Sequence, residues 1–362
     1  MKYYVQTFGC QMNKADSDKI SQAIEKIGYL PALNINQADL VIVNMCSVRQ
    51  SAVDRVFGVH DKLLKMNKSP ISVLTGCILK RDKQKFEKIF DYVLDIKNLT
   101  NWPKILKIRP KKALGKKPPE ISANVAFLTG CKKYCSYCVV PYVRGKEISR
   151  PAKEISFEIK NLIKNGTKEI WLLGQNVNSY KDRRIDFPKL LKMINSIDGY
   201  FWIRFTSSHP KDFSNKLADA ITKLEKVTPY LNLPAQSGDN NILKSMNRHY
   251  KIKNYEGIIK NLRKKIPDIS LSTDIIVGFP GETKKQFKNT ERLFKSERFD
   301  MAYINKYSTR AGTVASKLKD DVPINEKKRR EAILTKILKK TALEKNKKFI
   351  NKITKALIES SD

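Results

Sequence analysis

Short apolar runs alternate with amphipathic stretches over the first hundred residues. Three runs, residues 3–8, 40–44 and 71–75, are continuous enough to predict strands. Between them, apolar residues recur at helical spacing, and the first such stretch begins near Asn13 and stops at Gly28. Short apolar strands separated by helices are typical of a parallel, doubly wound sheet, which binds ligands beyond the carboxyl ends of its strands.

Six further strand-like runs occupy the second half, and each closes in polar or glycine-rich residues. They read NVAFLTG, EIWLLGQN, WIRFTSSH, YLNLPAQSG, LSTDIIVGFPGE and MAYINKYS, with helical segments between most of them. Six successive strand–helix units predict a partial (β/α)6 barrel with its chemistry at the carboxyl rim. The expected fold class is therefore α/β: an N-terminal doubly wound parallel sheet followed by a partial barrel.

A basic segment rich in proline and glycine, RPKKALGKKPPE, separates the two halves and has the composition of a linker. We expect an N-terminal domain over 1–107, a linker over 108–120 and the barrel over 121–324. The remainder, 325–362, begins with a basic amphipathic helix to about Lys348. The apolar stripe of this helix consists of Ile333, Leu334, Ile337 and Leu338.

Length and composition exclude several classes of protein. A chain of 362 residues with 41% apolar content can form two folded domains, which excludes disorder. No segment resembles a secretory signal or a membrane span, so we expect a cytoplasmic protein without a membrane partner. In a reducing cytosol, six cysteines are better explained as metal ligands or catalytic thiols than as disulfides.

The formal net charge of +35 favours a polyanionic partner such as RNA, because a positive field speeds encounter with nucleic acid. Solubility alone would be met by a far smaller net charge. The alternative explanation is an AT-rich genome, since most of the 71 basic residues are lysines spread along the whole chain. The sign of the charge is therefore more informative than its size.

Cys10, Cys46 and Cys77, which we call the N-terminal triad, each follow a predicted strand end by one or two residues. Three unrelated buried cysteines are the alternative, since free cysteine is often buried, but that alternative does not place all three at one sheet edge. Three thiolates without a nearby histidine favour an iron–sulfur cluster over zinc. The absent fourth ligand leaves one iron open for a substrate or a sulfur species.

Cys131, Cys135 and Cys138, the barrel triad, lie within eight residues of one another after the first barrel strand. A four-iron cluster held by three cysteines keeps one iron free to chelate the amino and carboxylate groups of S-adenosylmethionine. Electron transfer into the sulfonium then yields a carbon radical, which is cofactor chemistry that a protein positions. Structural zinc is the alternative, but it requires a fourth ligand, and the three histidines are far away in the sequence.

The stretch GCKKYCSYCVVPYVRGKEISRP closely resembles the radical S-adenosylmethionine motif of the methylthiotransferases. FGCQMN, NMCSVR and TGC resemble the cysteine sites of that family's N-terminal domain. The resemblance covers nearly the whole chain, including LLGQNVNSY, LPAQSGDNNILKSMNR and STDIIVGFPGET. FGCQMN together with GQNVN is similar to the branch that acts on tRNA bearing an isopentenylated adenosine beside the anticodon. The threonylcarbamoyladenosine and ribosomal-protein branches usually differ at both places.

The resemblance implies two 4Fe-4S clusters and S-adenosylmethionine as cofactors, with no catalytic residue beyond the cluster ligands. The cluster at the barrel triad would cleave S-adenosylmethionine, and the adenosyl radical would activate C2 of N6-isopentenyladenosine. The cluster at the N-terminal triad would present a sulfur, methylated by a second S-adenosylmethionine, for insertion at that carbon. The expected partners are the tRNA anticodon stem-loop, a sulfur donor and a flavodoxin-like or ferredoxin-like electron donor.

Further cofactor contacts are expected where the barrel strands end. The candidates are Gly174, Gln175, Asn176, Gln236, Ser237, Asp274 and Arg248. The first three close the second barrel strand, where contacts to the cofactor amino group are usual in this superfamily. Gly238, Gly278 and Glu282 lie at later strand ends. Apart from Arg248, each of these residues is explained equally well as a turn or helix-capping residue. For Arg248, the alternative is a solvated or structural arginine that contacts no phosphate or cofactor carboxylate.

Three arginines and one histidine are weaker candidates. Arg144, Arg150 and Arg204 are candidates for contacts to phosphates or a cofactor carboxylate, although solvated or structural arginines are common. For His209 the better interpretation is a rim histidine whose hydrogen bonds are satisfied.

The resemblance also implies a C-terminal RNA-binding β-barrel, the TRAM domain, and the sequence stops at ALIESSD, about where that barrel would begin. We therefore expect 325–362 to hold the basic helix and the start of a missing or truncated barrel. The basic linker and the helix would then supply part of the RNA affinity.

Three other functions fit parts of the sequence. A sister methylthiotransferase would act on threonylcarbamoyladenosine in tRNA or on a ribosomal protein. A non-catalytic RNA-binding protein would hold zinc or a single cluster. An electron-transfer protein is disfavoured, because such proteins seldom need a barrel with six polar rims or a charge of this size.

Overall fold

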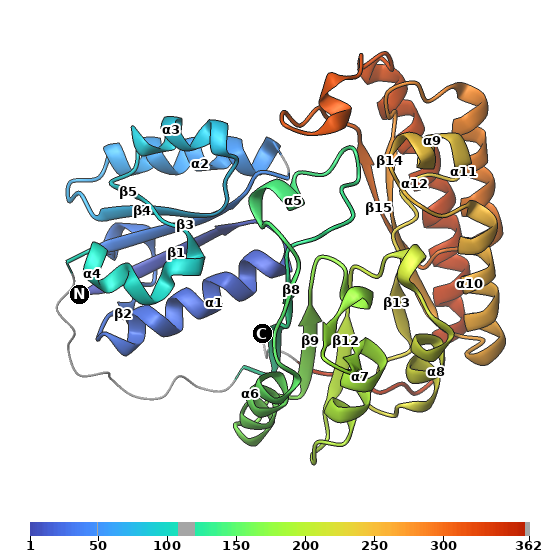
Figure 1. The fold of residues 1–362 in the computed structure, drawn as a ribbon, viewed down its shortest axis with the longest axis horizontal. Helices are drawn as coiled ribbons and strands as arrows, with labels where there is room; N and C mark the ends of the chain where they lie inside the picture. Colours follow the sequence, from blue (N-terminus) through green and yellow to red (C-terminus); the bar gives the residue numbers. More distant parts are fainter. Residues whose placement is uncertain (49, 108–119, 359–362) are drawn as a thin grey trace. The chain divides into compact units, whose positions relative to one another are not determined.

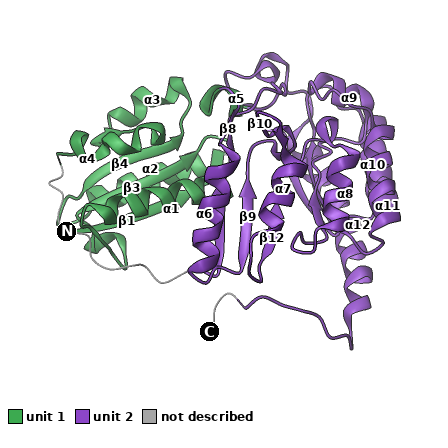
Figure 2. Ribbon diagram, turned by 60° about the horizontal axis from the view of Figure 1, so that its bottom comes forward, with its two compact units in different colours: residues 1–118, 139–145 green, residues 119–138, 146–362 purple. Residues whose placement is uncertain are grey.

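The computed structural model describes residues 1–48, 50–107 and 120–358, and it divides into two compact units (Figure 2). Unit 1 comprises Met1–Pro118 and Val139–Gly145, and unit 2 comprises Pro119–Cys138 and Lys146–Asp362.

The unit boundaries differ from the expected domains at one place. Residues 139–145 were expected in the barrel, but they fold with unit 1. The expected linker, 108–120, lies outside the described residues except for Glu120. The division into functional domains stays a prediction.

Unit 1 is built on a parallel sheet of five strands in the order β2-β1-β3-β4-β5 (Figure 1). The strands are β1 Lys2–Phe8, β2 Leu30–Pro31, β3 Leu40–Cys46, β4 Ile71–Cys77 and β5 Tyr92–Val93. The helices are α1 Gln11–Lys26, α2 Gln50–Leu64, α3 Lys80–Glu87, α4 Trp102–Ile105 and α5 Val140–Val143. The strand order reverses between β1 and β3, which is the switch point where doubly wound sheets bind ligands.

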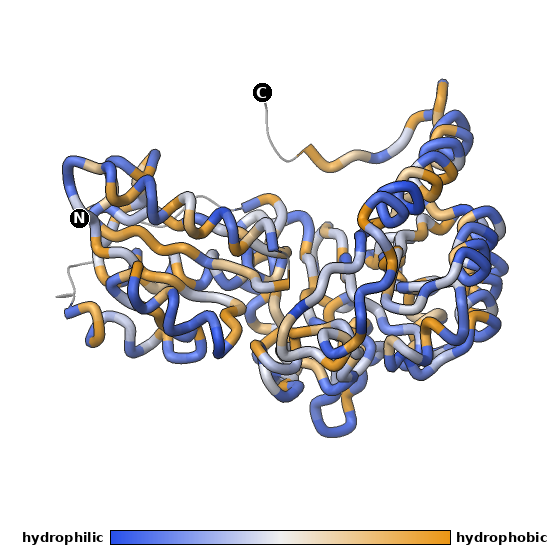
Figure 3. Tube along the Cα trace, turned by 90° about the horizontal axis from the view of Figure 1, so that it is seen from above, coloured by the Kyte–Doolittle hydropathy of each residue, from blue (hydrophilic) through white to orange (hydrophobic). Residues whose placement is uncertain are grey.

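The central strand β3 is buried along its whole length, as expected for a strand covered on both faces. Val41 and Val43 pack with residues of α2 and α3, whereas Leu40 and Ile42 pack with residues of α1 and α4. In Figure 3 the strands form an apolar layer between helices with polar outer faces. The predicted strands and helices of this half are confirmed. The edge strands β2 and β5 were not predicted, because two residues are too few to show an apolar pattern.

Unit 2 contains six parallel strands in two three-stranded sheets, ordered β12-β9-β6 and β13-β14-β15. They are β6 Ser122–Ala126, β9 Glu169–Leu173, β12 Trp202–Phe205, β13 Tyr230–Asn232, β14 Ser270–Val277 and β15 Met301–Lys306. A parallel bridge from Ile203 to Val227 links the two sheets. The larger helices are α6 Ala152–Lys164, α7 Phe187–Asn195, α8 Asn215–Lys223, α10 Ile252–Lys265, α11 Lys284–Glu297 and α12 Ile324–Asn346. All six strands of the predicted partial barrel are confirmed.

Short elements fill the loops of unit 2. They are β7 Leu128–Thr129, β8 Ile148–Ser149, β10 Lys181–Asp182, β11 Ile185–Asp186 and α9 Asn240–Ser245. Strands β7 and β8, which flank the barrel triad in the sequence, pair antiparallel. Strands β10 and β11, which follow β9, also pair antiparallel.

The C-terminal helix α12 belongs to the core of unit 2. Leu334 is fully buried, and Ile333, Ile337 and Leu338 pack against the same core, so the predicted apolar stripe is confirmed. Residues 351–358 form no helix or strand, and 359–362 lie outside the described residues, so the expected start of an RNA-binding barrel stays a prediction. None of the helices described here combines the length and the apolar character needed to cross a membrane.

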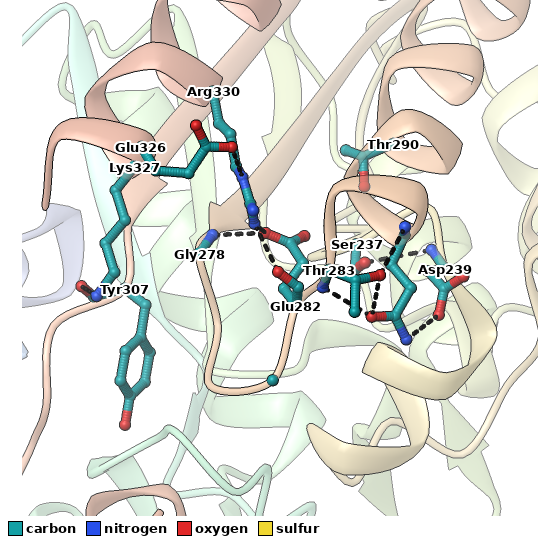
Figure 4. A network of polar contacts seen from close by, with 12 residues as sticks. Ser237, Asp239, Gly278, Glu282, Thr283, Thr290, Tyr307, Glu326, Lys327 and Arg330 are labelled. Atoms are coloured by element: carbon teal, nitrogen blue, oxygen red, sulfur yellow. Dashed lines mark hydrogen bonds and ion pairs between the residues drawn. The ribbon is translucent and has the colours of Figure 1, made fainter. Parts of the chain in front are cut away.

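Arg330 of α12 fixes the loop between β14 and α11, and Lys327 of α12 holds the chain after β15 (Figure 4). Arg330 Nη1 donates to Oε2 of Glu282 at 2.5 Å and to its carbonyl oxygen at 3.0 Å. The Gly278 N–H donates to the same carboxylate at 2.6 Å. Lys327 Nζ donates to the Tyr307 carbonyl oxygen at 3.2 Å. Glu282 therefore anchors this loop, and its expected place beside a cofactor or substrate pocket stays a prediction.

Candidate metal centres

The three cysteines of the N-terminal triad meet at the carboxyl edge of the unit 1 sheet. Cys46 and Cys77 end the neighbouring strands β3 and β4 and are direct register partners. Cys10 is the N-cap residue of α1, two residues beyond β1, and β1 pairs with the other side of β3. The structure thus places the triad at one edge, at the switch point, as expected. Cluster ligation by these residues stays a prediction.

Two buried asparagines tie the loops of this edge together. Asn13 Nδ2 donates to Asn44 Oδ1 at 2.9 Å and to the Met45 carbonyl oxygen at 3.0 Å. Asn44 Nδ2 donates in return to the Asn13 carbonyl oxygen at 2.8 Å and to Ser17 Oγ at 2.9 Å. The Cys10 thiol donates to Asn13 Oδ1 at 3.4 Å. The position of Cys10 is therefore coupled to the strand that ends in Cys46.

The glycines before two of the cysteines allow close approach of these loops. Gly76 has a φ of +106°, and a Cβ there would lie 2.3 Å from the Met45 carbonyl oxygen. A Cβ on Gly9 would lie 2.4 Å from Asn13 Oδ1. Any other residue at Gly76 would push its loop away from the end of β3, and any other residue at Gly9 would displace the Asn13 side chain.

Arg144, which sequence reasoning named only as a candidate for a phosphate or cofactor carboxylate, completes this edge. Its Nε donates to Cys77 Sγ at 3.0 Å, and its Nη2 donates to Asp16 Oδ2 at 2.9 Å. The thiol of Cys46 donates to Cys77, and this bond together with the Arg144 charge lowers the pKa of Cys77 to about 7. The same bond and burial raise the pKa of Cys46.

The donor set of the N-terminal triad fits an iron–sulfur cluster. All six cysteines, which lie within the described residues, are free of disulfides. Ser47 Oγ and Thr75 Oγ1, beside the triad, are buried without a hydrogen-bond partner, so polar room remains there. In the described parts of the chain, no three His, Cys, Asp or Glu side chains converge closely enough for a single ion. A four-iron cluster takes one thiolate ligand per iron, and three separate loops of this edge carry one cysteine each.

The barrel triad lies in the loop between β7 and β8, which many side chains hold in place. Lys133 Nζ pairs with Asp212 Oδ2 at 2.6 Å, and Asn247 Nδ2 donates to the Tyr134 carbonyl oxygen at 2.9 Å. The Ser136 N–H donates to the Met246 carbonyl oxygen at 3.0 Å. A loop fixed at several points can present three thiols in one defined arrangement.

The surroundings of the barrel triad differ from one cysteine to the next. Cys135 is buried, whereas Cys131 and Cys138 are half-buried, and burial raises the pKa of Cys131. Arg248 Nη1 donates to Cys135 Sγ at 3.7 Å, and its Nη2 donates to the Pro234 carbonyl oxygen at 2.7 Å. Arg248 was expected to contact the cofactor. The partners seen here are protein groups, and the cofactor contact stays a prediction.

Five buried polar atoms without a hydrogen-bond partner gather where the neighbouring strands β9 and β12 end. They are Gln175 Oε1, Asn176 Oδ1, Asn178 Oδ1, Ser208 Oγ and His209 Nε2. Buried polar atoms are normally hydrogen-bonded, so this cluster indicates room for a polar ligand. Gln175 and Asn176, with Gly174 before them, were expected here. Asn178 and Ser208 were missed, although both stand in strand-closing runs that the sequence marks as polar.

The expectation for His209 was wrong. Its Nδ1 accepts from the Lys211 N–H at 3.2 Å, but Nε2 has no partner. Because burial lowers the pKa of His209 to about 2, the imidazole is neutral and Nε2 carries the proton. His209 Nε2–H is therefore a buried donor without a partner, beside the end of β12.

The remaining strand-end candidates divide between the rim and the scaffold. Gln236 adopts a φ of +66°, and its N–H donates to the Asp274 carbonyl oxygen at 2.7 Å. Asp274 Oδ2 accepts from Asn232 Nδ2 at 3.2 Å. Ser237 Oγ accepts from the Asp239 N–H at 3.2 Å, in the turn drawn in Figure 4. The left-handed backbone of Gln236 is the kind of strain found at ligand sites.

Arg150 and Arg204 are engaged within unit 2. Arg150 pairs with Glu158 at 2.6 Å. Arg204 pairs with Glu169 at 2.8 Å, and its guanidinium lies over the Trp171 ring. Both side chains therefore have structural partners.

Each half of the chain matches a family of known proteins. Residues 125–294 match the Radical SAM superfamily, and residues 2–96 match a family described as Uncharacterized protein family UPF0004. The fold is similar to that of the radical S-adenosylmethionine methyltransferase TsrM from Kitasatospora setae, with a TM-score of 0.63 at 12% identity. That similarity covers 87% of this chain and 74% of TsrM. The fold and the barrel triad thus define a radical SAM protein.

Curated relatives define the class more closely. The tRNA-2-methylthio-N(6)-dimethylallyladenosine synthase of Clostridium botulinum (strain Hall) is 40% identical over 99% of this chain and 86% of the relative. The enzyme of that name from Caldicellulosiruptor saccharolyticus is 41% identical over 99% of this chain and 82% of the relative. The chain belongs to the tRNA-2-methylthio-N(6)-dimethylallyladenosine synthase family of radical SAM enzymes. A 4Fe-4S cluster and S-adenosylmethionine are the cofactors of radical SAM enzymes.

Proposed function

We propose that this protein inserts a methylthio group at C2 of N6-isopentenyladenosine, which is N6-dimethylallyladenosine, beside the anticodon of tRNA. The observation that carries the proposal is the pair of cysteine triads, one in each unit, on a chain 40% identical to curated synthases of this name. Each triad leaves a cluster one ligand short. Two incomplete sites suit a reaction in which one activates the substrate carbon and the other delivers sulfur.

In unit 2, Cys131, Cys135 and Cys138 would hold the radical SAM cluster. When bound there, the cluster and S-adenosylmethionine supply the radical chemistry. The unpartnered oxygens of Gln175 and Asn176 would accept hydrogen bonds from a cofactor amino group, and His209 Nε2–H would donate to an acceptor. Gln236, Ser237, Asp274 and Arg248 would line the same rim, with Gly174 giving the backbone room. These side chains orient the cofactor and exclude water.

In unit 1, Cys10, Cys46 and Cys77 would hold a second 4Fe-4S cluster. The buried hydroxyls of Ser47 and Thr75 would face the sulfur species bound there. The asparagine pair and the two glycines would hold the cysteine loops together at one edge of the sheet. A second S-adenosylmethionine would supply the methyl group of the methylthio product.

The proposed partners follow from this chemistry. The net charge of +35 suits the tRNA anticodon stem-loop. Reductive cleavage needs one electron, for which a flavodoxin-like or ferredoxin-like donor is proposed, and the inserted sulfur needs a sulfur donor. A cytoplasmic location is proposed because tRNA and such donors meet there.

Nucleoside analysis of tRNA from a strain lacking the gene tests this function. We expect 2-methylthio-N6-isopentenyladenosine to disappear and N6-isopentenyladenosine to accumulate, with restoration by the wild-type gene but not by Cys135→Ala. An unchanged level of the methylthio nucleoside would overturn the proposal. Loss of the methylthio form of threonylcarbamoyladenosine instead would identify the sister activity.

Anaerobic reconstitution separates the two-cluster model from a cluster- or zinc-dependent binding protein. We expect about eight irons per chain, four for each cluster. Zinc, or about four irons, would refute the second cluster.

A further inference from the structure

Arg144 occupies an unusual place in the chain. It follows Cys138, the last cysteine of the barrel triad, by six residues, yet Val139–Gly145 folds with unit 1. Its segment includes α5 and the buried Pro141. Gly145, with a φ of +78°, turns the chain back toward unit 2. The segment therefore enters unit 1 and leaves it again within seven residues, and Arg144 is its one arginine.

The guanidinium of Arg144 joins a thiol to a carboxylate. Nε lies 3.0 Å from Cys77 Sγ, and Nη2 lies 2.9 Å from Asp16 Oδ2. The side chains of Arg144 and Asp16 are 11% and 8% exposed. Burial keeps water from screening either contact, so each acts at close range and at reduced dielectric.

The barrel triad has a comparable but weaker arrangement. Arg248 Nη1 lies 3.7 Å from Cys135 Sγ, and the other partners of Arg248 are the Pro234 carbonyl and the Tyr250 hydroxyl. Those partners are neutral, whereas Asp16 is a carboxylate. The N-terminal triad therefore has the closer N–H···S contact and an additional group of opposite charge.

Hydrogen bonds to ligand sulfurs and nearby charges set the reduction potential of an iron–sulfur cluster. A donor and a positive charge at a ligand sulfur favour the reduced cluster, which carries one more negative charge. A carboxylate beside that positive charge offsets part of its effect.

We propose that Arg144 is a positioning residue that acts through Cys77. It orients the cluster held by the N-terminal triad and raises the reduction potential of that cluster, and the negative charge of Asp16 offsets part of this increase. This inference rests on the proposed function, because it requires the second cluster.

The test is an EPR-monitored redox titration of the reconstituted full chain. Cys131, Cys135 and Cys138 are replaced by Ala in this background, so that only the N-terminal cluster contributes. We expect Arg144→Gln to lower the midpoint potential and Asp16→Asn to raise it. Arg144→Lys keeps the charge and should recover part of the wild-type potential. Arg150→Gln, which removes an arginine paired with Glu158 in unit 2, is the matched control and should leave the potential unchanged.

Shifts in opposite directions would not arise from general loosening of the fold. Shifts of the same sign, or no shift, in Arg144→Gln and Asp16→Asn would overturn the inference. If Arg144→Gln fails to assemble the cluster, Asp16→Asn alone tests the inference. An unchanged or lowered midpoint potential in Asp16→Asn would then refute it. Absence of iron from the triple-alanine background with Arg144 intact would instead refute the second cluster, and with it the proposed function.

Discussion

Asn13 and Asn44 hold each other at 2.9 Å in the interior of unit 1, each with a side-chain amide fully removed from solvent. Asn13 begins the first turn of α1 and Asn44 lies in β3, so their pairing joins the Cys10 loop to the strand that ends in Cys46. Both amides also bond to backbone oxygens across the same gap. The spacing of two cysteines of the N-terminal triad therefore depends on this pair.

Asn44→Ala should destabilise unit 1 by about 1–3 kcal/mol, because it removes buried hydrogen bonds that Asn44 makes with Asn13 and Ser17. Hydrogen exchange of the β3 and β4 amides, followed by mass spectrometry, measures the effect. Asn36→Ala, at an exposed side chain of the same unit, is the control and should change exchange little. Equal protection in the two variants would show that the asparagine pair does not hold the edge together.

Two glycines of unit 1 should respond to alanine with opposite signs. Gly76→Ala places a Cβ 2.3 Å from the Met45 carbonyl oxygen at a φ of +106°, so we expect a loss of stability greater than about 1 kcal/mol. Gly58 lies inside α2 with open space around its Cβ position, and Gly58→Ala should stabilise by about 0.5–1 kcal/mol. Urea unfolding of the chain without clusters measures both. A neutral Gly76→Ala would contradict the close approach.

The buried ion pair between α12 and the loop after β14 predicts a large cost for a single substitution. Arg330→Met leaves the Glu282 carboxylate, 1% exposed, without its charge partner, and should destabilise unit 2 by about 3–5 kcal/mol. Arg329→Met is the matched control, because that neighbouring arginine is half exposed and its pair with Glu326 should contribute at most about 1 kcal/mol. Thermal unfolding should show a clearly lower melting temperature for Arg330→Met than for Arg329→Met. Similar melting temperatures would argue against a stabilising ion pair between Arg330 and Glu282.

The lowered pKa of His209 predicts how the stability of unit 2 depends on pH. Its pKa is lowered to about 2 in the folded protein, from an ordinary value of 6.5. Between these values the unfolded chain binds a proton that the folded chain does not, so acidification below pH 6.5 should destabilise unit 2 by about 1.4 kcal/mol per pH unit. The facing groups are Arg248, Lys133, Lys211, His249, Asp212 and Tyr250.

Urea unfolding of the chain at pH 7, 6 and 5 measures this contribution. The Oδ1 of the new side chain in His209→Asn can still accept from the Lys211 N–H. This variant should lose the part of the pH dependence of the unfolding free energy that His209 contributes. Asn36→Ala, at an exposed side chain of unit 1, is the control and should keep the wild-type slope. Identical slopes for His209→Asn and the wild type would mean that His209 is not held neutral.

The strands and their cysteines were predictable because their signal is local. A continuous apolar run marks β3, and parallel strands bring residues at their carboxyl ends to one edge, so Cys46 and Cys77 could be placed together. The apolar stripe of α12 followed in the same way from helical spacing around Leu334.

What the sequence did not reveal depends on contacts between distant segments. Nothing near Arg144 indicates Cys77 as its partner, since 67 residues separate them. The orphaned Nε2 of His209 likewise depends on the burial of that side chain under other elements. Arg330 and Glu282, which form an ion pair, are 48 residues apart, and nothing in the sequence around either residue indicates the other as its partner.

The most direct test of the two-cluster account measures two products of one reaction. The reconstituted chain is incubated anaerobically with S-adenosylmethionine, dithionite, sulfide as the sulfur source, and tRNA that carries N6-isopentenyladenosine. The account predicts 5'-deoxyadenosine and 2-methylthio-N6-isopentenyladenosine from the wild type, neither product from Cys135→Ala, and 5'-deoxyadenosine alone from Cys77→Ala. Methylthio product from Cys77→Ala, or 5'-deoxyadenosine from the wild type without any methylthio product, would contradict it.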